Sequence, residues 1–275
     1  MTPGFYGRHQ GLAKRLIRPW FRWLWSIEVV GLENVPRIGP AVLCPNHLAA
    51  IDSFVVPSVL DRPVIYVGKA EYLDSWKTRW LFPALGMIPI DRRGGEHAQA
   101  ALDAARAVLE DGGLFAIYPE GTRSRTGQLH RGKTGAARLA IETGAPIMPV
   151  GLIGTNDIQP IGSSRPQFFQ KASVQFGSPI SVERYRTRIG DHALYRELMD
   201  EVMFEIQAMT GQEYVDRYAG DPAGGATTIQ SGRGIAGVPA PAMTVPLPSA
   251  MDLVAGGRRS SAEALVSRPL PARVA

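Results

Sequence analysis

Short apolar segments typical of buried strands alternate along the chain with longer segments of helical periodicity, and this alternation restricts the fold more than any other feature. The segments expected to form strands are 28–32, 41–44, 64–67, 86–90, 114–118, 147–153, which Pro149 should interrupt, and 173–177. Helices are expected from about residue 52 and over 96–111, 135–143 and 191–209. The pattern predicts one α/β domain, residues 31–218, with its chemistry on loops at strand ends.

One of these strands, 41–44, leads directly into a histidine and an aspartate. A loop between the strand and the next helix could fold His47 and Asp52 together, which an ideal helix would not do at a spacing of five. A neutral imidazole can accept a proton at physiological pH, and a carboxylate on its other nitrogen fixes the tautomer. The pair therefore suits proton abstraction, although a structural histidine bound to a helix-capping aspartate fits the same residues.

The loop after strand 114–118 combines groups that suit a polyol phosphate. It contains a carboxylate, a glycine, a hydroxyl and a guanidinium in succession: Glu120, Gly121, Thr122 and Arg123. The carboxylate could accept hydrogen bonds from hydroxyls, while the other groups and backbone amides bind phosphate oxygens. Lys133 adds positive charge nearby.

A second candidate phosphate ligand follows strand 86–90. Arg92 stands beside Arg93, Gly94 and Gly95, and an arginine next to flexible glycines can offer a bidentate fork to a phosphate. The same residues also fit a solvated arginine in a surface turn. Before this strand, residues 69–84 form a helical or irregular apolar segment that could cover an acyl site or pack in the core.

The N-terminal segment, residues 1–30, combines cations with tryptophans at mostly helical spacing. Such a basic amphipathic helix suits the headgroup layer of a membrane, although it could also pack on its own domain with a solvated basic face. The net charge of +5 and pI near 9.5 make an anionic partner plausible. No uncharged apolar run approaches the length that spans a bilayer, so the chain should not cross a membrane.

The ends and the cysteine count set further limits. From about residue 219 to residue 275 the composition changes to Gly, Ala, Pro, Ser and Thr, which predicts a disordered tail. The single cysteine, Cys44, excludes an intrachain disulfide and a cysteine-rich metal site. His47 and Asp52 alone would make a poor metal site, so no metal is expected.

Four blocks in this order resemble the glycerolipid acyltransferase family, best known for the 1-acylglycerol-3-phosphate acyltransferases. The blocks are Asn46-His47 with Asp52, residues 86–92, residues 118–124 and residues 147–150. The resemblance covers roughly residues 30–180 and implies a central mixed sheet flanked by helices. Two positions depart from the common pattern: Ile88-Pro89-Ile90 replaces a segment that often carries an aromatic residue, and Tyr118 replaces a phenylalanine.

The resemblance implies an O-acyltransferase that makes phosphatidate from lysophosphatidate. His47 would act as general base and Asp52 would orient the imidazole and stabilise its charge, so that the hydroxyl attacks an acyl thioester directly. The family's ligands of the phosphorylated acceptor correspond to Arg92, Glu120, Gly121 and Arg123. Acyl-CoA or acyl carrier protein would be the donor, with no other cofactor. The implied partners exclude nucleic acid and include anionic lipids at the cytoplasmic face of the plasma membrane.

Three other functions remain open from the sequence. The acceptor could be glycerol phosphate or another lysolipid. Water could replace the alcohol in an acyl-thioester hydrolase, with Cys44 as nucleophile, although a small buried strand cysteine is the simpler explanation of that residue. Finally, the basic N-terminus and the arginine-rich loops would also suit a lipid-binding protein without turnover.

Overall fold

The computed structural model describes residues 10–69, 81–84, 86–90, 96–163 and 165–220. The chain divides into two units, Met1–Gly225 and Ala226–Ala275, and every described residue belongs to the first. The predicted tail therefore lies outside the described residues from residue 221 onward. So do Arg92 and most of the apolar segment 69–84.

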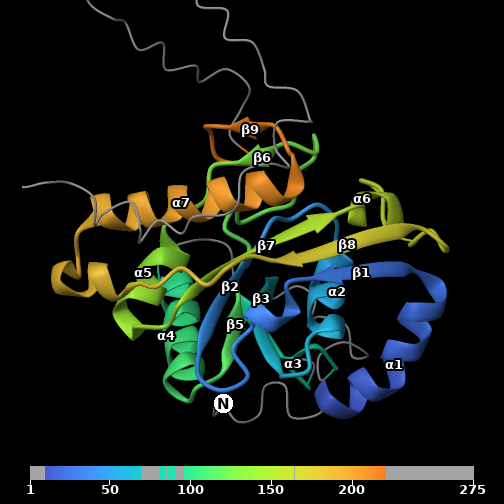
Figure 1. Ribbon diagram of the computed structural model, residues 1–275, viewed down its shortest axis with the longest axis horizontal. Helices are drawn as coiled ribbons and strands as arrows, with labels where there is room; N and C mark the ends of the chain where they lie inside the picture. The colour runs from blue at the N-terminus through green and yellow to red at the C-terminus, as the bar shows by residue number, and fades with distance from the viewer. Residues whose placement is uncertain (1–9, 70–80, 85, 91–95, 164, 221–275) are drawn as a thin grey trace, which may run out of the picture. The chain divides into compact units, whose positions relative to one another are not determined.

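A seven-stranded sheet forms the centre of the described part (Figure 1). Its strands are β1 (Ser26–Val30), β2 (Ala41–Pro45), β3 (Val64–Lys69), β4 (Met87–Ile90), β5 (Leu114–Ala116), β7 (Ile147–Ile153) and β8 (Lys171–Phe176). They lie side by side in the order β1-β8-β7-β2-β5-β3-β4. Every neighbouring pair is parallel except β7 and β8. The predicted α/β fold with a mixed sheet is therefore confirmed.

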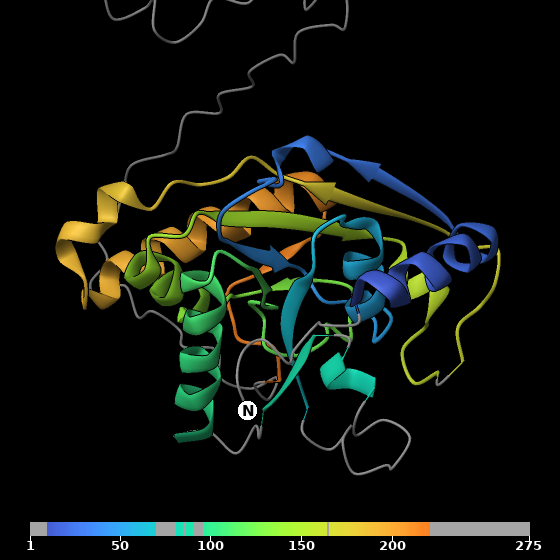
Figure 2. The same cartoon turned by 90° about the horizontal axis from the view of Figure 1, so that it is seen from below.

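Helices cover both faces of this sheet (Figures 1 and 2). They are α1 (Gln10–Leu24), α2 (Asp52–Val59), α3 (Leu81–Ala84), α4 (Glu96–Glu110), α5 (Gly135–Thr143), α6 (Thr155–Ile158) and α7 (His192–Thr210), with 3-10 turns η2 (Leu32–Asn34) and η4 (Glu183–Arg188). Alternation along β2 sends Val42 and Cys44 into the core beneath α4, α5 and α7, and Ala41 and Leu43 into the core beneath α1 and α2. Because both faces are covered, all five residues of β2 are buried.

The structure corrects some predicted boundaries. The first strand starts at Ser26 rather than residue 28, and α1 ends at Leu24. Strand β7 is not interrupted, because its antiparallel register with β8 begins only at Val150. Pro149, which lacks an N–H, therefore lies just beyond the end of that ladder. The carbonyl oxygen of Pro149 still accepts a hydrogen bond from the Gly177 amide at 2.9 Å. A small parallel pair, β6 (Leu129–His130) and β9 (Tyr214–Val215), has no counterpart in the sequence predictions.

Helix α1 packs on α2 and β1, and its contacts are specific. The buried amide of Gln10 bonds both backbone groups of Val64 at 2.8 Å. Arg18 donates to the carbonyl oxygens of Ser58 and Val59 at the end of α2. Arg18 therefore caps a neighbouring helix and does not belong to a solvated cationic face. Within the described residues, no helix is both long and apolar enough to cross a membrane.

Candidate active site

The candidate site lies where two neighbouring strands end. Strands β2 and β5 are parallel partners, so their carboxyl ends meet at one edge of the sheet. The loops that follow them are joined by a hydrogen bond of 2.7 Å from the Ser124 amide to the carbonyl oxygen of His47. Asn46 holds the first loop from the other side, because its side-chain amide bonds both the N–H and the carbonyl of Leu152 in β7.

The histidine and the aspartate form the predicted pair. His47 Nδ1 lies 2.9 Å from Asp52 Oδ2, which also accepts the amides of Leu48 and Ala49 at 2.8 Å. Asp52 is the first residue of α2 and is wholly buried. Since the carboxylate fixes Nδ1 as the donor, Nε2 is the unprotonated nitrogen of a neutral ring. His47 lines a cavity, which gives that nitrogen access to a substrate.

Tyr118 supports the imidazole from one face. The two rings stack with centroids 3.9 Å apart and planes inclined by 17°. Burial raises the pKa of Tyr118 well above its usual value, and the charge of Asp52 adds to this effect. The phenol therefore stays protonated, and its oxygen lies 3.4 Å from Ser53 Oγ. A neutral, electron-rich ring against the imidazole favours the cation that forms when His47 takes up a proton.

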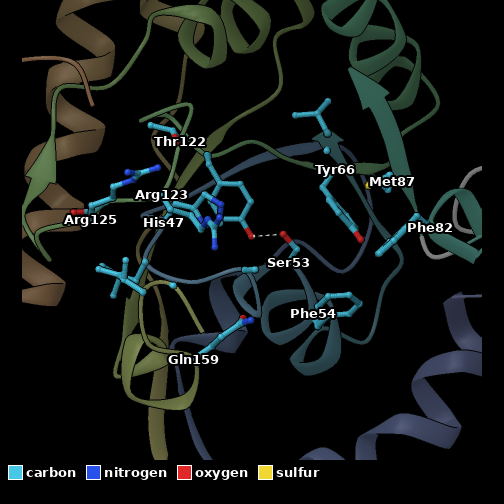
Figure 3. A pocket seen from close by; sticks show the side chains of 18 residues that line it. His47, Ser53, Phe54, Tyr66, Phe82, Met87, Thr122, Arg123, Arg125 and Gln159 are labelled. Carbon is cyan, nitrogen blue, oxygen red and sulfur yellow. Dashed lines mark hydrogen bonds between the residues drawn. The ribbon is translucent and has the colours of Figure 1, made fainter. Parts of the chain in front are cut away.

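The cavity has a volume of about 500 Å³ and two chemically different ends. One end is polar and cationic, and its lining residues are Thr122, Arg123, Ser124 and Arg125. The other end is largely apolar and is lined by Phe54, Tyr66, Phe82 and Met87. In Figure 3, His47 and Arg123 appear on one side of the cavity and Tyr66, Phe82 and Met87 on the other. The base therefore faces a space that can hold a charged group and an apolar chain together.

Glu120 lies beneath the site and does not line the cavity. It is only 1% exposed, and its two oxygens accept the amides of His47 at 3.1 Å and His130 at 3.0 Å. Burial raises the pKa of Glu120 to about 7, against the opposing effect of these two hydrogen bonds. The sequence suggested contact with substrate hydroxyls, whereas this geometry favours a positioning role for Glu120 under the His47 loop.

This burial makes Glu120 a source of pH-dependent stability. Because its pKa is higher in the folded protein, its stabilising contribution is complete below pH 4.5 and is lost as pH rises through about 7. We expect the free energy of unfolding of the wild type, relative to Glu120→Gln, to fall by roughly 3 kcal/mol over this window. Urea titrations at several pH values measure this difference, and a constant difference would contradict the assignment.

Gly121 and Lys133 are neighbours in the structure. Gly121 has φ +73°, and a Cβ there would lie 3.1 Å from Lys133 Cε. The left-handed backbone conformation therefore favours glycine here, and a Cβ would also push slightly against the lysine stem. The Lys133 amide donates to the carbonyl oxygen of Pro119 at 2.8 Å, while its exposed side chain does not line the cavity. Of the predicted acceptor ligands that the structure describes, Thr122 and Arg123 line it.

Ser124 and Gln159 are among the cavity residues to which the sequence assigned no role. Ser124 is 1% exposed, and its hydroxyl has no hydrogen-bond partner among the described residues. Gln159 comes from the end of α6, and its side-chain oxygen accepts the Ile51 amide at 2.9 Å. The sequence could have indicated Ser124 as a further candidate phosphate ligand, because it follows Arg123 directly. Nothing in the sequence around Gln159 indicates that it reaches a loop 108 residues earlier.

Cys44 does not belong to this site. Its side chain is fully buried in the core beneath α4, α5 and α7, and it does not line the cavity. Burial raises the pKa of its thiol well above the usual value, so the nucleophilic thiolate is strongly disfavoured. In the described ranges, no three His, Cys, Asp or Glu side chains group closely enough to hold a metal ion.

Comparisons with known proteins agree with this geometry. Residues 26–153 match the family model described as Acyltransferase. This match confirms the resemblance to acyltransferases that the sequence indicated. The matched span contains β1, β2, α2, β5 and β7, and with them the histidine, the aspartate and the loop that carries Arg123.

The relatives include proteins named 1-acyl-sn-glycerol-3-phosphate acyltransferase. One from Borreliella burgdorferi is 32% identical over 162 residues, which are 58% of this chain and 60% of the relative. The alpha form from Mus musculus is 29% identical over 60% of this chain and 55% of its own length. The chain thus matches little more than half the length of these two relatives.

A solved structure supports the fold. The 1-acyl-sn-glycerophosphate acyltransferase PlsC from Thermotoga maritima superimposes with a TM-score of 0.57 and 20% sequence identity. The superposition covers 74% of this chain and 78% of that one. The arrangement of the mixed sheet and its helices is therefore that of a known acyltransferase structure.

Proposed function

We propose that this protein is an O-acyltransferase that moves a fatty acyl group from a thioester to the free hydroxyl of lysophosphatidate, giving phosphatidate. The observation that carries the proposal is the pair of His47 and Asp52 facing a cavity with one cationic and one apolar end. A lysophosphatidate molecule has the same two parts, a phosphate and an acyl chain. The names of the relatives point to the same acceptor.

His47 is the general base in this proposal. As the acceptor hydroxyl oxygen attacks the thioester carbonyl, Nε2 takes its proton, and Asp52 stabilises the resulting imidazolium. The new C–O bond gives a tetrahedral intermediate, from which the C–S bond breaks. The imidazolium then returns the proton to the departing sulfur, which leaves as a thiol. No acyl-enzyme forms, which agrees with the buried position of Cys44.

The cationic end of the cavity would bind the acceptor phosphate. Arg123 can supply a two-pronged guanidinium, and the hydroxyls of Thr122 and Ser124 can donate to the remaining phosphate oxygens. The unpartnered Ser124 hydroxyl is already buried at the cavity wall, so a phosphate would give it a partner. The apolar end would accept fatty acyl carbons. Arg92, which lies outside the described part, is proposed as a further ligand of the phosphate.

We expect Arg123→Ala to act mainly on acceptor binding. The loss of a charged hydrogen bond should raise the Michaelis constant for lysophosphatidate by about 10- to 100-fold, with a smaller change in turnover number. Initial rates over a range of acceptor concentrations measure both values. The matched control is Arg37→Ala, which removes an exposed arginine before β2. An unchanged Michaelis constant in Arg123→Ala would count against phosphate binding by this residue.

The acceptor and the donor can be tested together by thiol release. The wild type would be given oleoyl-CoA or an oleoyl acyl carrier protein, with lysophosphatidate, glycerol phosphate, another lysolipid or no acceptor. We expect release that requires lysophosphatidate. Release with a different acceptor would reassign the substrate, and release without any acceptor would indicate a hydrolase.

We also propose that the enzyme works as a peripheral protein at the cytoplasmic face of the plasma membrane, where its acceptor and product reside. Two observations support this. Trp20 and Trp23 are more than 60% exposed on α1, and tryptophan favours the membrane–water interface. The net charge of +5 suits an anionic lipid surface.

A further inference from the structure

Four large aromatic side chains from two distant parts of the chain form one exposed surface, here called the aromatic patch. Trp20 and Trp23 of α1 are 63% and 64% exposed, and Phe168 and Phe169, which precede β8, are 55% and 71% exposed. Successive ring centroids lie 6.2 Å apart for Trp20 and Trp23, 6.0 Å for Trp23 and Phe169, and 6.5 Å for the two phenylalanines. The patch is therefore continuous from the helix to the loop.

The loop is held against the helix in this exposed position. The Phe169 amide donates to the Leu24 carbonyl at 2.7 Å, and the Trp25 indole donates to the Gln167 carbonyl at 2.6 Å. Phe169 has φ +59°, a left-handed conformation that bulky residues rarely adopt. The fold thus keeps two phenylalanines in water at the cost of backbone strain, and such patches usually mark an interaction surface.

The surroundings of the patch favour a lipid bilayer as the partner. Three exposed cations lie near its members in the sequence: Arg15, Arg165 and Lys171. Arg15 and Trp23 are eight residues apart on α1 and therefore share one side of that helix. Aromatic residues flanked by arginine and lysine are the composition that binds the interface of an anionic membrane.

The patch is also linked to the candidate active site. Ile161 and Gly162 line the cavity, and Ile161 is 56% exposed. They follow α6 and belong to the same connection between β7 and β8 as the two phenylalanines. Figure 2 shows this connection beside α1. A surface that contacts the patch would therefore lie close to the segment that borders the cavity.

We propose that the aromatic patch is a membrane-docking surface, in which residues 165–170 form a second insertion element beside α1. The inference rests on the proposed function, since a lysolipid acceptor reaches the cavity from a bilayer. Docking through both elements fixes the orientation of the domain, because two separate contacts restrict rotation on the membrane more than one helix does. The segment around Ile161 then faces the lipid from which the acceptor enters.

Vesicle flotation of the full chain tests this surface. The vesicles contain phosphatidylcholine and phosphatidylglycerol in equal parts, and the variants are Phe168→Ser, Phe169→Asn and the two combined. Asparagine tolerates the left-handed conformation at position 169. We expect the double variant to bind vesicles about ten-fold more weakly than the wild type. Phe204→Ser, which removes a 66% exposed phenylalanine from α7, is the matched control and should bind like the wild type.

The inference would be overturned if the double variant bound vesicles as strongly as the wild type does, or if the wild type did not bind them. If Phe169→Asn lowers the melting temperature, vesicle binding by Phe168→Ser alone is the test of the docking surface. Acyl transfer to a monomeric short-chain lysophosphatidate separates the inference from the proposed function. Transfer by the wild type together with undiminished vesicle binding by the double variant would reject the docking surface alone. Patch-dependent binding without transfer to any acceptor would uphold the docking surface and reject the enzyme.

Discussion

Replacing His47 by alanine should lower the turnover number by about a thousand-fold, because no other group at this position can take the proton of the acceptor hydroxyl. The fold should persist. Asp52 Oδ2 keeps the amides of Leu48 and Ala49 as donors when the imidazole is removed, so its buried charge is not left without partners. The loss therefore concerns the chemistry rather than the structure.

Steady-state rates with saturating donor and acceptor measure this effect, and circular dichroism with thermal melting reports the fold. His192→Ala provides the matched control, since it removes an exposed histidine from the start of α7. We expect the control to keep wild-type turnover. A His47→Ala enzyme with more than about a tenth of wild-type turnover would exclude general-base catalysis by this residue.

Replacing Asp52 by asparagine should have an effect of similar size, a fall in turnover of about a thousand-fold or more. Asparagine can place its oxygen where Oδ2 now accepts three N–H groups, so the loop can keep its shape. Its amide group would then occupy the position of Oδ1, which has no partner among the described residues. What is lost is the negative charge that stabilises the imidazolium during proton transfer.

A comparison of Asp52→Asn with Asp52→Ala separates charge from architecture. Alanine leaves three N–H donors without an acceptor in a buried site, and we expect a loss of about 2–3 kcal/mol in the free energy of unfolding. Asparagine should cost far less stability yet nearly as much turnover. Near-normal turnover in Asp52→Asn would show that Asp52 has only a structural role, as an acceptor for the loop amides. Asp157→Asn, at an exposed aspartate of α6, is the control.

The central pair could be predicted from the sequence because its geometry is local. An apolar run that ends at Pro45 and a helix that begins at Asp52 leave only a short loop, and such a loop brings residues five apart into contact. The strands that carry both site loops were also predictable, since each is a short apolar run with a clear break after it. Local pattern therefore determined the position of the base and its carboxylate.

The supporting contacts could not be predicted, because they depend on which strands become neighbours. Asn46 reaches Leu152, and Glu120 joins the amides of His47 and His130, only because β7, β2 and β5 lie side by side. The sequence indicated the carboxylate of Glu120 but not its burial, and so suggested a substrate contact. Likewise, the sequence indicated a cationic helix in residues 1–30 but not that one of its cations, Arg18, binds the end of α2.

The most direct test of the account is to identify the product formed from an isotopically labelled oleoyl thioester and lysophosphatidate. Mass spectrometry should detect labelled phosphatidate in an amount equal to the thiol released, and His47→Ala should form almost none. Labelled free oleate in place of phosphatidate would contradict the account, because the hydroxyl activated by His47 would then belong to water.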